Sequence, residues 1–308
     1  MPIRIALVSA REALALDEDM GPLAAALREA GAEVATPFWD DAAVDWRSYS
    51  AAVLRSTWDY VERIDEFLPW AERCAQQTVL LNPPAVVRWN TDKHYLHELA
   101  QQGIPVVPTR FVEPESIAAQ QLERFLGADA DALTAGSADS FVEFVIKPSI
   151  GAGSKDTARY HRHEVGRATE HLARLLAQGR SAMLQPYLDR VDEQGETALI
   201  YLGGEFSHAI RKGPLLRAGA ALVEGLFAPE QITPREPQSD ELAIARQAYA
   251  AIGSSRPVYA RIDLIRGADD TPVVLELELT EPSLFFAHAP GSAERFARVL
   301  LERAHSAG

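Results

Sequence analysis

Charged side chains recur at a spacing of two residues near the C-terminal end of the chain. Arg261 and Asp263 lie in one apolar stretch, and Glu276 and Glu278 lie in the next. Side chains two residues apart on a strand point to the same side, so each pair shares one face. The polar turn 267–270 joins the two stretches and predicts an antiparallel pair of strands, which gathers three carboxylates on one patch. Carboxylates this close repel one another unless a cation neutralises them.

Mg²⁺ is the cation that suits this patch best. It prefers a few hard oxygen ligands and keeps room for water and phosphate oxygens. The sequence therefore predicts a magnesium site on Asp263, Glu276 and Glu278. The alternative is an amphipathic strand whose glutamates face water, but this alternative leaves Asp263 unexplained in an otherwise apolar strand.

A second candidate site lies in the middle of the chain. Residues 141–146 and 157–160 have the alternation of a β-hairpin, but the segment between them is longer than a hairpin turn needs. Lys147 precedes this segment, and its small residues include Ser149, Gly151, Gly153 and Ser154. Small residues let backbone N–H groups approach an anion, and the lysine adds a positive charge. The pattern predicts a phosphate-binding flap, and an ordinary surface hairpin is the alternative.

Further polar residues lie on either side of this flap. Lys93 begins a predicted helix, where a lysine is unfavourable unless an anion binds there. Gln185 ends a predicted strand after the flap, and Glu196 follows it. Arg211 and Lys212 lie beside a turn further on. Taken singly, each of these basic residues is more typical of a solvated surface than of a ligand site.

Strands and helices alternate over about the first 83 residues, which predicts a small doubly wound parallel sheet. A helix and a strand follow within residues 90–109. The pattern then changes to a small α+β lid, with a polar loop at 126–140, and to antiparallel strands with two helices after residue 188. We therefore divide the chain into an N-terminal domain (1–88), a linker helix and strand (89–110), a lid (111–187) and a C-terminal antiparallel-sheet part (188–308).

Composition excludes several classes of function. The 308 residues are 47% hydrophobic and 24% charged, which is ordinary for a globular protein. A net charge of −14 argues against nucleic acid as the main partner. The single cysteine, Cys74, excludes an intrachain disulfide and a cysteine-rich zinc site. No apolar run approaches the roughly 20 residues of a membrane span, and no leader pattern opens the chain, so we expect a cytoplasmic protein.

The order of the candidate residues resembles that of the ATP-grasp superfamily, from Lys93 to Pro282. The N-terminal alternation resembles the domain that precedes the ATP-grasp fold in such enzymes, and the whole is similar to the glutathione synthetase branch. The closest resemblance is to the O-ureido-serine cyclo-ligases of cycloserine biosynthesis. It rests on five segments: VLRSTWDY (53–60), LNP (81–83), RWNTDKHYL (88–96), KPSIGAGSKDTARY (147–160) and LELELTEPSLFF (275–286).

This resemblance implies roles for the candidate residues. Lys93 and Lys147 would hold the ATP phosphates, with the flap residues named above closing over them. Glu196 would bind the ribose, and Arg211 would lie near the γ-phosphate. The hinge that contacts adenine in the family corresponds to Gln185, Pro186, Tyr187 and Leu188.

The family's metal ligands, an Asp followed by Glu-x-Asn, correspond to Asp263, Glu276 and Glu278. Glu278 departs from the usual Asn and makes the site more negative. The resemblance implies ATP and Mg²⁺, with two ions expected. Lys147, Arg211 and Arg261 are the catalytic candidates.

The substrate residues are sought where a strand of the N-terminal sheet ends, because open α/β sheets bind ligands there. Arg55 could pair with a carboxylate and Asp59 with an amino group. Ser56, Thr57, Trp58 and Tyr60 complete this segment. The alternative is a helix N-cap at Ser56 or Thr57 with Trp58 packed in the core.

The reaction implied by the resemblance is ligation of a carboxylate to an amine through an acylphosphate, with release of ADP and phosphate. We expect intramolecular closure of O-ureido-serine, because no second polar cluster is found for a second substrate. The alternatives are a ligase for amino acids or dipeptides, a small-molecule kinase, and a nucleotide-binding subunit without catalysis. We also expect the chains to pair through the N-terminal domain as a dimer or tetramer.

Overall fold

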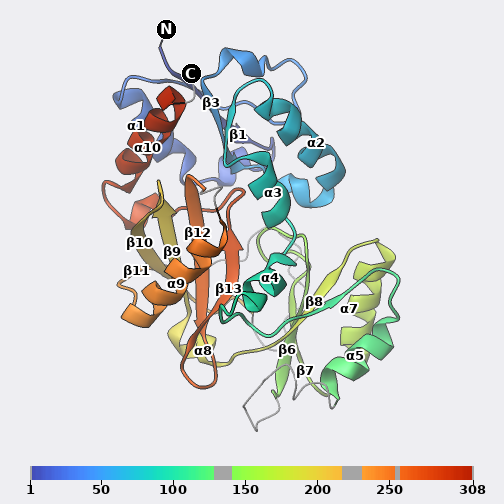
Figure 1. Cartoon of the computed structure of the whole chain (residues 1–308). Coiled ribbons are helices and arrows are strands. Elements are labelled where there is room, and N and C mark those ends of the chain that lie inside the picture. Colours follow the sequence, from blue (N-terminus) through green and yellow to red (C-terminus); the bar gives the residue numbers. More distant parts are fainter. Residues whose placement is uncertain (1, 128–140, 217–230, 254–256, 307–308) are drawn as a thin grey trace.

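The computed structural model describes residues 2–127, 141–216, 231–253 and 257–306. Its elements form three sheets, one in each of three successive parts of the chain (Figure 1). Most of the predicted polar loop 126–140 lies outside the described residues. Among the described parts of the chain, none of the helices has the length and apolar character that crossing a bilayer takes.

The N-terminal sheet is parallel, with the strand order β2-β1-β3-β4. Its strands are β1 (Arg4–Ser9), β2 (Glu33–Ala35), β3 (Ala51–Ser56) and β4 (Val79–Leu81), and its helices are α1 (Met20–Glu29) and α2 (Ile64–Ala75). Alternate residues of β1 pack toward α1 and toward α2, so both faces of the sheet are covered. This covering explains why the central residues of β1 and β3, 5–8 and 51–54, are apolar, and it confirms the predicted doubly wound sheet.

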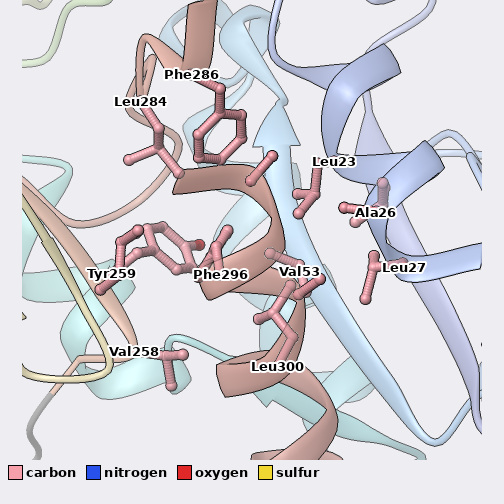
Figure 2. Packing of buried hydrophobic residues seen from close by; sticks show 14 of the residues in the cluster. Leu23, Ala26, Leu27, Val53, Val258, Tyr259, Leu284, Phe286, Phe296 and Leu300 are labelled. Atoms are coloured by element: carbon pink, nitrogen blue, oxygen red, sulfur yellow. The ribbon is translucent and has the colours of Figure 1, made fainter. Parts of the chain in front are cut away.

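The C-terminal helix α10 (Ser292–Ser306) joins the N-terminal sheet to the rest of the protein. Phe296 and Leu300 of α10 lie between Leu23 and Leu27 of α1 and Tyr259 at the start of the last strand pair (Figure 2). One continuous core therefore connects the two ends of the chain, and the termini lie close together at the top of the molecule (Figure 1).

The lid contains an antiparallel sheet with the order β5-β8-β6-β7. Its strands are β5 (Arg110–Val112), β6 (Glu143–Pro148), β7 (Ala158–His161) and β8 (Ala182–Pro186). Helices α5 (Ala118–Leu126) and α7 (Val165–Ala177) pack together with the sheet around Phe125, Phe144 and Leu172. The predicted hairpin on either side of the flap is confirmed by the pairing of β6 with β7.

The C-terminal sheet is antiparallel, with the order β11-β10-β9-β12-β13. Its strands are β9 (Glu196–Leu202), β10 (Glu205–Lys212), β11 (Ile232–Arg235), β12 (Tyr259–Arg266) and β13 (Pro272–Glu278). Around it lie α3 (Pro84–Asn90), α4 (Tyr95–Gln101), α8 (Arg190–Gln194) and α9 (Ser239–Ala251). Short 3₁₀ turns occur at η1 (Leu14–Leu16), η2 (Trp46–Ser48), η3 (Trp58–Glu62) and η4 (Phe286–His288).

One predicted strand, within residues 104–109, does not form. The structure has only an isolated bridge between Val106 and Val274 at this place. Pro105 and Pro108 have no N–H to donate, so a regular ladder cannot extend along this segment.

Candidate active site

A cavity of about 670 Å³ lies where the three parts of the chain meet. Its wall includes Trp58 and Tyr60 of the N-terminal domain, Lys147 of the lid and Asp263 and Glu276 of the C-terminal sheet. The volume is typical of a site for a small ligand, and a mixture of apolar and charged lining suits a ligand with both kinds of surface.

The hinge end of this cavity is largely apolar. Gln185 and Pro186 end β8, and Tyr187 and Leu188 follow them along the wall. The remaining apolar lining at this end includes Val107, Val145, Val191, Ile265 and Leu275. The Gln185 amide donates to the Thr109 hydroxyl at 2.8 Å, which fixes the hinge strand against the linker. A flat heteroaromatic ring would fit this slot, as the predicted adenine hinge requires.

The predicted charged strands form as expected at the centre of the cavity. β12 and β13 pair antiparallel, with Arg261 opposite Glu278 and Asp263 opposite Glu276. Asp263 has 1% side-chain exposure, whereas Glu276 and Glu278 keep 21% and 29%. The strand alternation thus brings all three carboxylates to one wall, which confirms the predicted pairing of the strands.

Each of these carboxylates is held by a cation. Lys147 Nζ lies 2.7 Å from Glu276 Oε1, and Lys212 Nζ lies 2.7 Å from Asp263 Oδ2. Arg261 bridges two of the acids: its Nε lies 2.9 Å from Asp263 Oδ1, and its terminal nitrogen contacts Glu278. The negative charges of these three carboxylates are therefore balanced by lysine and arginine side chains of the protein itself.

The pKa values of these three acids depend on the balance between burial and the adjacent cations. Burial opposes ionisation of Asp263 and Glu276, but the adjacent cations outweigh it and hold the pKa of each below its usual range. At Glu278 burial prevails over the attraction of Arg261, and the neighbouring Asp263 and Glu276 add repulsion. The pKa of Glu278 is therefore raised to about 8.

The chemistry of this donor set fits Mg²⁺, which prefers hard oxygen ligands. In this structure the oxygens face lysine and arginine instead. Among the residues that the structure describes, no group of three or more His, Cys, Asp or Glu side chains is arranged to hold a metal ion. Binding of Mg²⁺ by Asp263, Glu276 and Glu278 would thus require these contacts to be exchanged, and the assignment stays a prediction.

Side chains from the linker fix the free edge of β13. The Asn90 side chain donates to Leu277 O at 2.6 Å and accepts from Leu279 N at 2.6 Å, and the Tyr95 hydroxyl accepts from Leu277 N at 2.9 Å. An edge strand otherwise leaves its backbone groups unpaired. These contacts hold Glu276 and Glu278 in place, and sequence analysis did not identify Asn90 or Tyr95 as contributors.

The flap lies across the cavity between β6 and β7. Gly151, Gly153 and Ser154 line the cavity, and Gly153 has a φ of +61°, which favours glycine. The Ser154 hydroxyl is buried, and within the part of the chain that the structure describes it has no hydrogen-bond partner. Such an orphan hydroxyl can be satisfied by a ligand oxygen, so its position supports the predicted phosphate role.

Two other predicted phosphate contacts differ from expectation. Lys93 does not begin a helix, since α4 starts at Tyr95. Its Nζ donates to Gly151 O in the flap at 2.9 Å, and its N–H donates to Ser149 O at 3.0 Å. Ser149 is buried and does not line the cavity, because its backbone is bonded to Lys93 and to Ser181. Lys93 lines the cavity and holds the flap at the same time.

The flap also rests on the N-terminal domain. Ala152 is buried in the apolar cluster that contains Trp58 and Tyr60, and Ile150 packs against the same cluster. Lys155 forms an ion pair with Glu62. The flap thus covers the cavity in this structure.

Arg211 does not reach the cavity. Its guanidinium donates to Gln194 O at 2.8 Å and to Glu193 O at 3.0 Å, on the other face of β10. The adjacent Lys212 lines the cavity and lies 2.9 Å from Glu196 as well as 2.7 Å from Asp263. Neighbouring residues of a strand face opposite sides, so Lys212 is the member of this pair whose side chain lies at the cavity.

The predicted substrate segment contributes only partly. Trp58 lines the cavity, and so does the neighbouring Tyr60, whereas the other members of the segment do not: Arg55, Ser56, Thr57 and Asp59. The Ser56 hydroxyl bonds Ser9 at 2.8 Å in the core. Asp59 accepts from Trp39 Nε1 at 2.8 Å and from Arg63, so it is already occupied.

Arg55 has the largest departure from prediction. It is fully buried, and its guanidinium lies 3.2 Å from Asp17, 3.4 Å from Asp19 and 3.1 Å from Pro282 O. It does pair with carboxylates, but they are the protein's own. Arg55 therefore positions the segment after β13 and does not line the cavity.

Glu281 is a cavity residue that sequence analysis missed. It is 7% exposed and lies in the loop after β13, where strand alternation no longer predicts direction. Its position three residues after Glu278, in a segment already noted for its acids, is the only signal in the sequence.

Comparison with known proteins supplies relatives over the whole chain. Residues 5–82 match the N-terminal domain of the D-cycloserine synthetase DcsG. The cycloserine biosynthesis protein DcsG of Streptomyces lavendulae is 42% identical over 304 residues, which cover 97% of this chain and 98% of that protein. The crystal structure of D-cycloserine synthetase DcsG superposes with a TM-score of 0.89 at 41% identity, over 98% of this chain and 99% of the other.

A more distant structure shares the fold. The ATP-grasp ligase PsnB, in a complex with a minimal precursor, Mg and ADP, has a TM-score of 0.59 at 17% identity, over 98% of each chain. The predicted ATP-grasp architecture is thereby confirmed.

Proposed function

Because the chain belongs to the DcsG family of ATP-grasp ligases, which form C–N bonds, we propose that it closes the ring of O-ureido-serine in cycloserine biosynthesis, through an acylphosphate. The observation that carries this proposal is the 42% identity to DcsG over 97% of the chain. The cavity also contains the lysine, arginine and carboxylate side chains described above. The proposed products are ADP, phosphate and a ring-closed isoxazolidinone.

In this proposal the apolar hinge slot holds the adenine ring, with Glu196 placed for the ribose. The flap N–H groups and the Ser154 hydroxyl face the phosphates, and Lys93 and Lys147 balance their charge. Glu276, Glu278 and Asp263 would hold two Mg²⁺ ions, which offset phosphate charge and orient the γ-phosphoryl group. Positioning and charge balance are the main contributions a protein makes to phosphoryl transfer.

The substrate end follows from the chemistry of the acylphosphate. The γ-phosphoryl group moves to the substrate carboxylate beside Arg261, whose guanidinium can stabilise the negative charge that develops there. The ureido nitrogen bonded to oxygen then attacks the acyl carbon, loses its proton, and phosphate leaves. Ring closure leaves a carbamoyl group on that nitrogen, and its loss with one water as carbon dioxide and ammonia gives cycloserine.

Two features favour an intramolecular attack. The closed flap limits access of water, which would otherwise hydrolyse the acylphosphate. A nucleophile in the same molecule has a high effective concentration, so a weakly nucleophilic nitrogen can compete with the remaining water.

The test is incubation of the protein with Mg-ATP and O-ureido-serine, followed by mass spectrometry and nucleotide analysis. We expect one ADP for each isoxazolidinone formed, with or without its carbamoyl group. Lys147→Met should abolish turnover, whereas Arg88→Met, which removes an exposed cation paired with Glu72 at the surface, should retain it. Release of AMP would contradict the acylphosphate, a dipeptide from a mixed amino acid panel would contradict cyclisation, and a released phosphorylated substrate would indicate a kinase.

A further inference from the structure

Glu281 differs in its partners from five other acids that line the cavity. Asp19, Glu196, Asp263, Glu276 and Glu278 each have a lysine or arginine at salt-bridge distance. Among the described residues, Glu281 has no salt-bridge partner, although only 7% of the residue is exposed. The Tyr60 side chain lies beside its carboxyl group, and this interaction opposes the rise that burial causes in the pKa of Glu281. A buried acid with a neutral partner is free to bind a cationic group from a ligand.

The backbone that carries Glu281 is held by four buried side chains. Trp58 Nε1 lies 3.3 Å from Glu281 O, and Arg55 lies 3.1 Å from Pro282 O. The Tyr259 hydroxyl donates to Thr280 O at 2.9 Å, and Arg261 donates to Ser283 O at 3.2 Å. Every carbonyl from residue 280 to 283 is thus fixed by a donor from another part of the chain. A site held in this way binds with little cost in ordering.

The surroundings of Glu281 identify the kind of ligand. Burial raises the pKa of Glu281, and the attraction of Arg261, Lys93 and Arg55 is too weak to reverse this. A cation bound beside it would restore the ionised form. A metal ion needs several oxygen ligands, whereas an ammonium group is satisfied by one carboxylate and a few further acceptors.

We propose that Glu281, oriented by Tyr60, binds the α-ammonium group of the amino acid substrate, with the substrate carboxylate directed toward Arg261. This inference rests on the proposed function. It places the substrate between η3 and the end of β13, away from the hinge slot that suits the nucleotide. It also assigns Arg55 a role, since this buried arginine holds the loop that presents Glu281.

Glu281→Gln is the informative change, because it keeps the shape of the side chain and removes its charge. We expect KM for O-ureido-serine to rise about 10- to 100-fold, the value of one charge-assisted hydrogen bond, while KM for Mg-ATP stays within about twofold. Tyr60→Phe should show a smaller rise of the same kind. Glu72→Gln is the matched control, because Glu72 is 52% exposed, pairs with Arg88 at the surface and does not line the cavity, so it should leave both constants unchanged.

A substrate analogue without the amino group, 3-(ureidooxy)propanoate, separates recognition from general damage. The wild type should use it as poorly as Glu281→Gln uses the amino acid, and the substitution should have no further effect on it. An equal loss for both compounds, or an unchanged KM for the amino acid, would overturn the inference. If Glu281→Gln does not fold, Tyr60→Phe is decisive by the same two-compound comparison.

The outcome is distinct from that of the proposed function. If the wild type fails on O-ureido-serine but phosphorylates another amino acid, the proposed function fails and the same comparison is made with that amino acid and its desamino form. If the wild type accepts only carboxylates that lack an amino group, the inference about Glu281 is contradicted.

Discussion

The two ends of the cavity balance their charges in different ways. At the lid end, Glu276 faces Lys147, and Asp263 faces Lys212 and Arg261. At the N-terminal end, the cation Arg55 is withdrawn into the core, and Glu281 faces the cavity with Tyr60 beside it. At the lid end each acid lies beside a cation, whereas at the other end acids outnumber the single cation Arg55.

This difference indicates what each end can bind. A ligand that carries both a metal ion and phosphates can separate the pair of Lys147 and Glu276 and satisfy each member with the opposite charge. No charge is left unpaired in such an exchange, which avoids the large penalty of an isolated buried ion. At the N-terminal end Arg55 is buried against Asp17 and Asp19, and Glu281 has no salt-bridge partner among the described residues, so this acid favours a ligand that supplies a cation of its own.

The largest expected effect comes from breaking the paired end. Glu276→Gln removes a carboxylate proposed to hold Mg²⁺ and should lower kcat by roughly 10³-fold, equivalent to about 4 kcal/mol of transition-state stabilisation. Metal-free ADP should bind no more weakly, because Lys147 is released from its partner. Steady-state kinetics and calorimetric titration measure both effects.

Two results would count against this assignment of Glu276. One is a collapse of thermal stability with unchanged activity per folded molecule, which would make the residue structural. The other is a similar loss of kcat in Glu72→Gln, a control acid with 52% side-chain exposure that pairs with Arg88 at the surface.

A matched pair of neighbours sharpens the comparison further. Lys212→Met leaves buried Asp263 with Arg261 alone and should destabilise the protein by about 3 kcal/mol, at the low end for a broken buried pair. Arg211→Met removes contacts to two carbonyls near the surface and should cost about 1 kcal/mol. Denaturant unfolding compares the two variants.

The same two variants show whether Lys212 or Arg211 contributes to phosphoryl transfer. We expect Lys212→Met to lower kcat by roughly 10²-fold, since removal of one preorganised charge at a transition state has an effect of that order, and Arg211→Met to stay within about threefold. The reverse pattern would restore Arg211 to the role that sequence analysis assigned to it.

The sequence predicted the paired end well because regular strands carry it. Alternation placed Glu276 and Glu278 on one face, and the polar turn 267–270 predicted the antiparallel pairing with the strand of Asp263 and Arg261, which the structure confirms. The flap was predicted for a similar local reason, since its small residues interrupt a hairpin. In both cases the decisive contacts lie on adjacent strands or within one turn.

The N-terminal end could not be predicted in the same way, because its contacts connect distant parts of the chain. Arg55 is paired with Asp17, 38 residues away, and with Pro282, 227 residues away. Asp19 accepts backbone N–H groups from Leu284 and Phe286. Nothing in the local pattern around Arg55 distinguishes an arginine that faces a ligand from one that braces a loop.

For another reason the sequence could not show which of Arg211 and Lys212 lies at the cavity. Strand alternation shows that two neighbours face opposite sides, but not which side is the cavity. The pairing register of β10 with β9 also shifts between Phe206 and His208. The direction of each side chain of β10 therefore cannot be found by counting alternate residues from the turn. The cavity side is fixed only by the partners of Lys212, which are Glu196 and Asp263.

The smallest expected effect concerns protonation of Glu278, whose pKa is raised to about 8 by burial and by the neighbouring acids. Its ordinary value is 4.5, so between these values the folded state binds more protons than the unfolded state. Stability contributed by this group is therefore present at low pH and is lost as pH rises toward 8. The slope is at most about 1.4 kcal/mol per pH unit, and solvent screening reduces it because 29% of the side chain is exposed.

Glu278→Gln removes this titration and should become more stable relative to the wild type as the pH of metal-free samples is raised from 6 to 8. Thermal melting at several pH values measures the difference, and Glu72→Gln, with its exposed carboxylate, should show no such trend. Binding of Mg²⁺ to the wild type must displace the same proton, so its affinity should increase over this interval. A difference in melting temperature that stays constant with pH would show that Glu278 is already ionised, and the lid end would then carry an excess negative charge as the N-terminal end does.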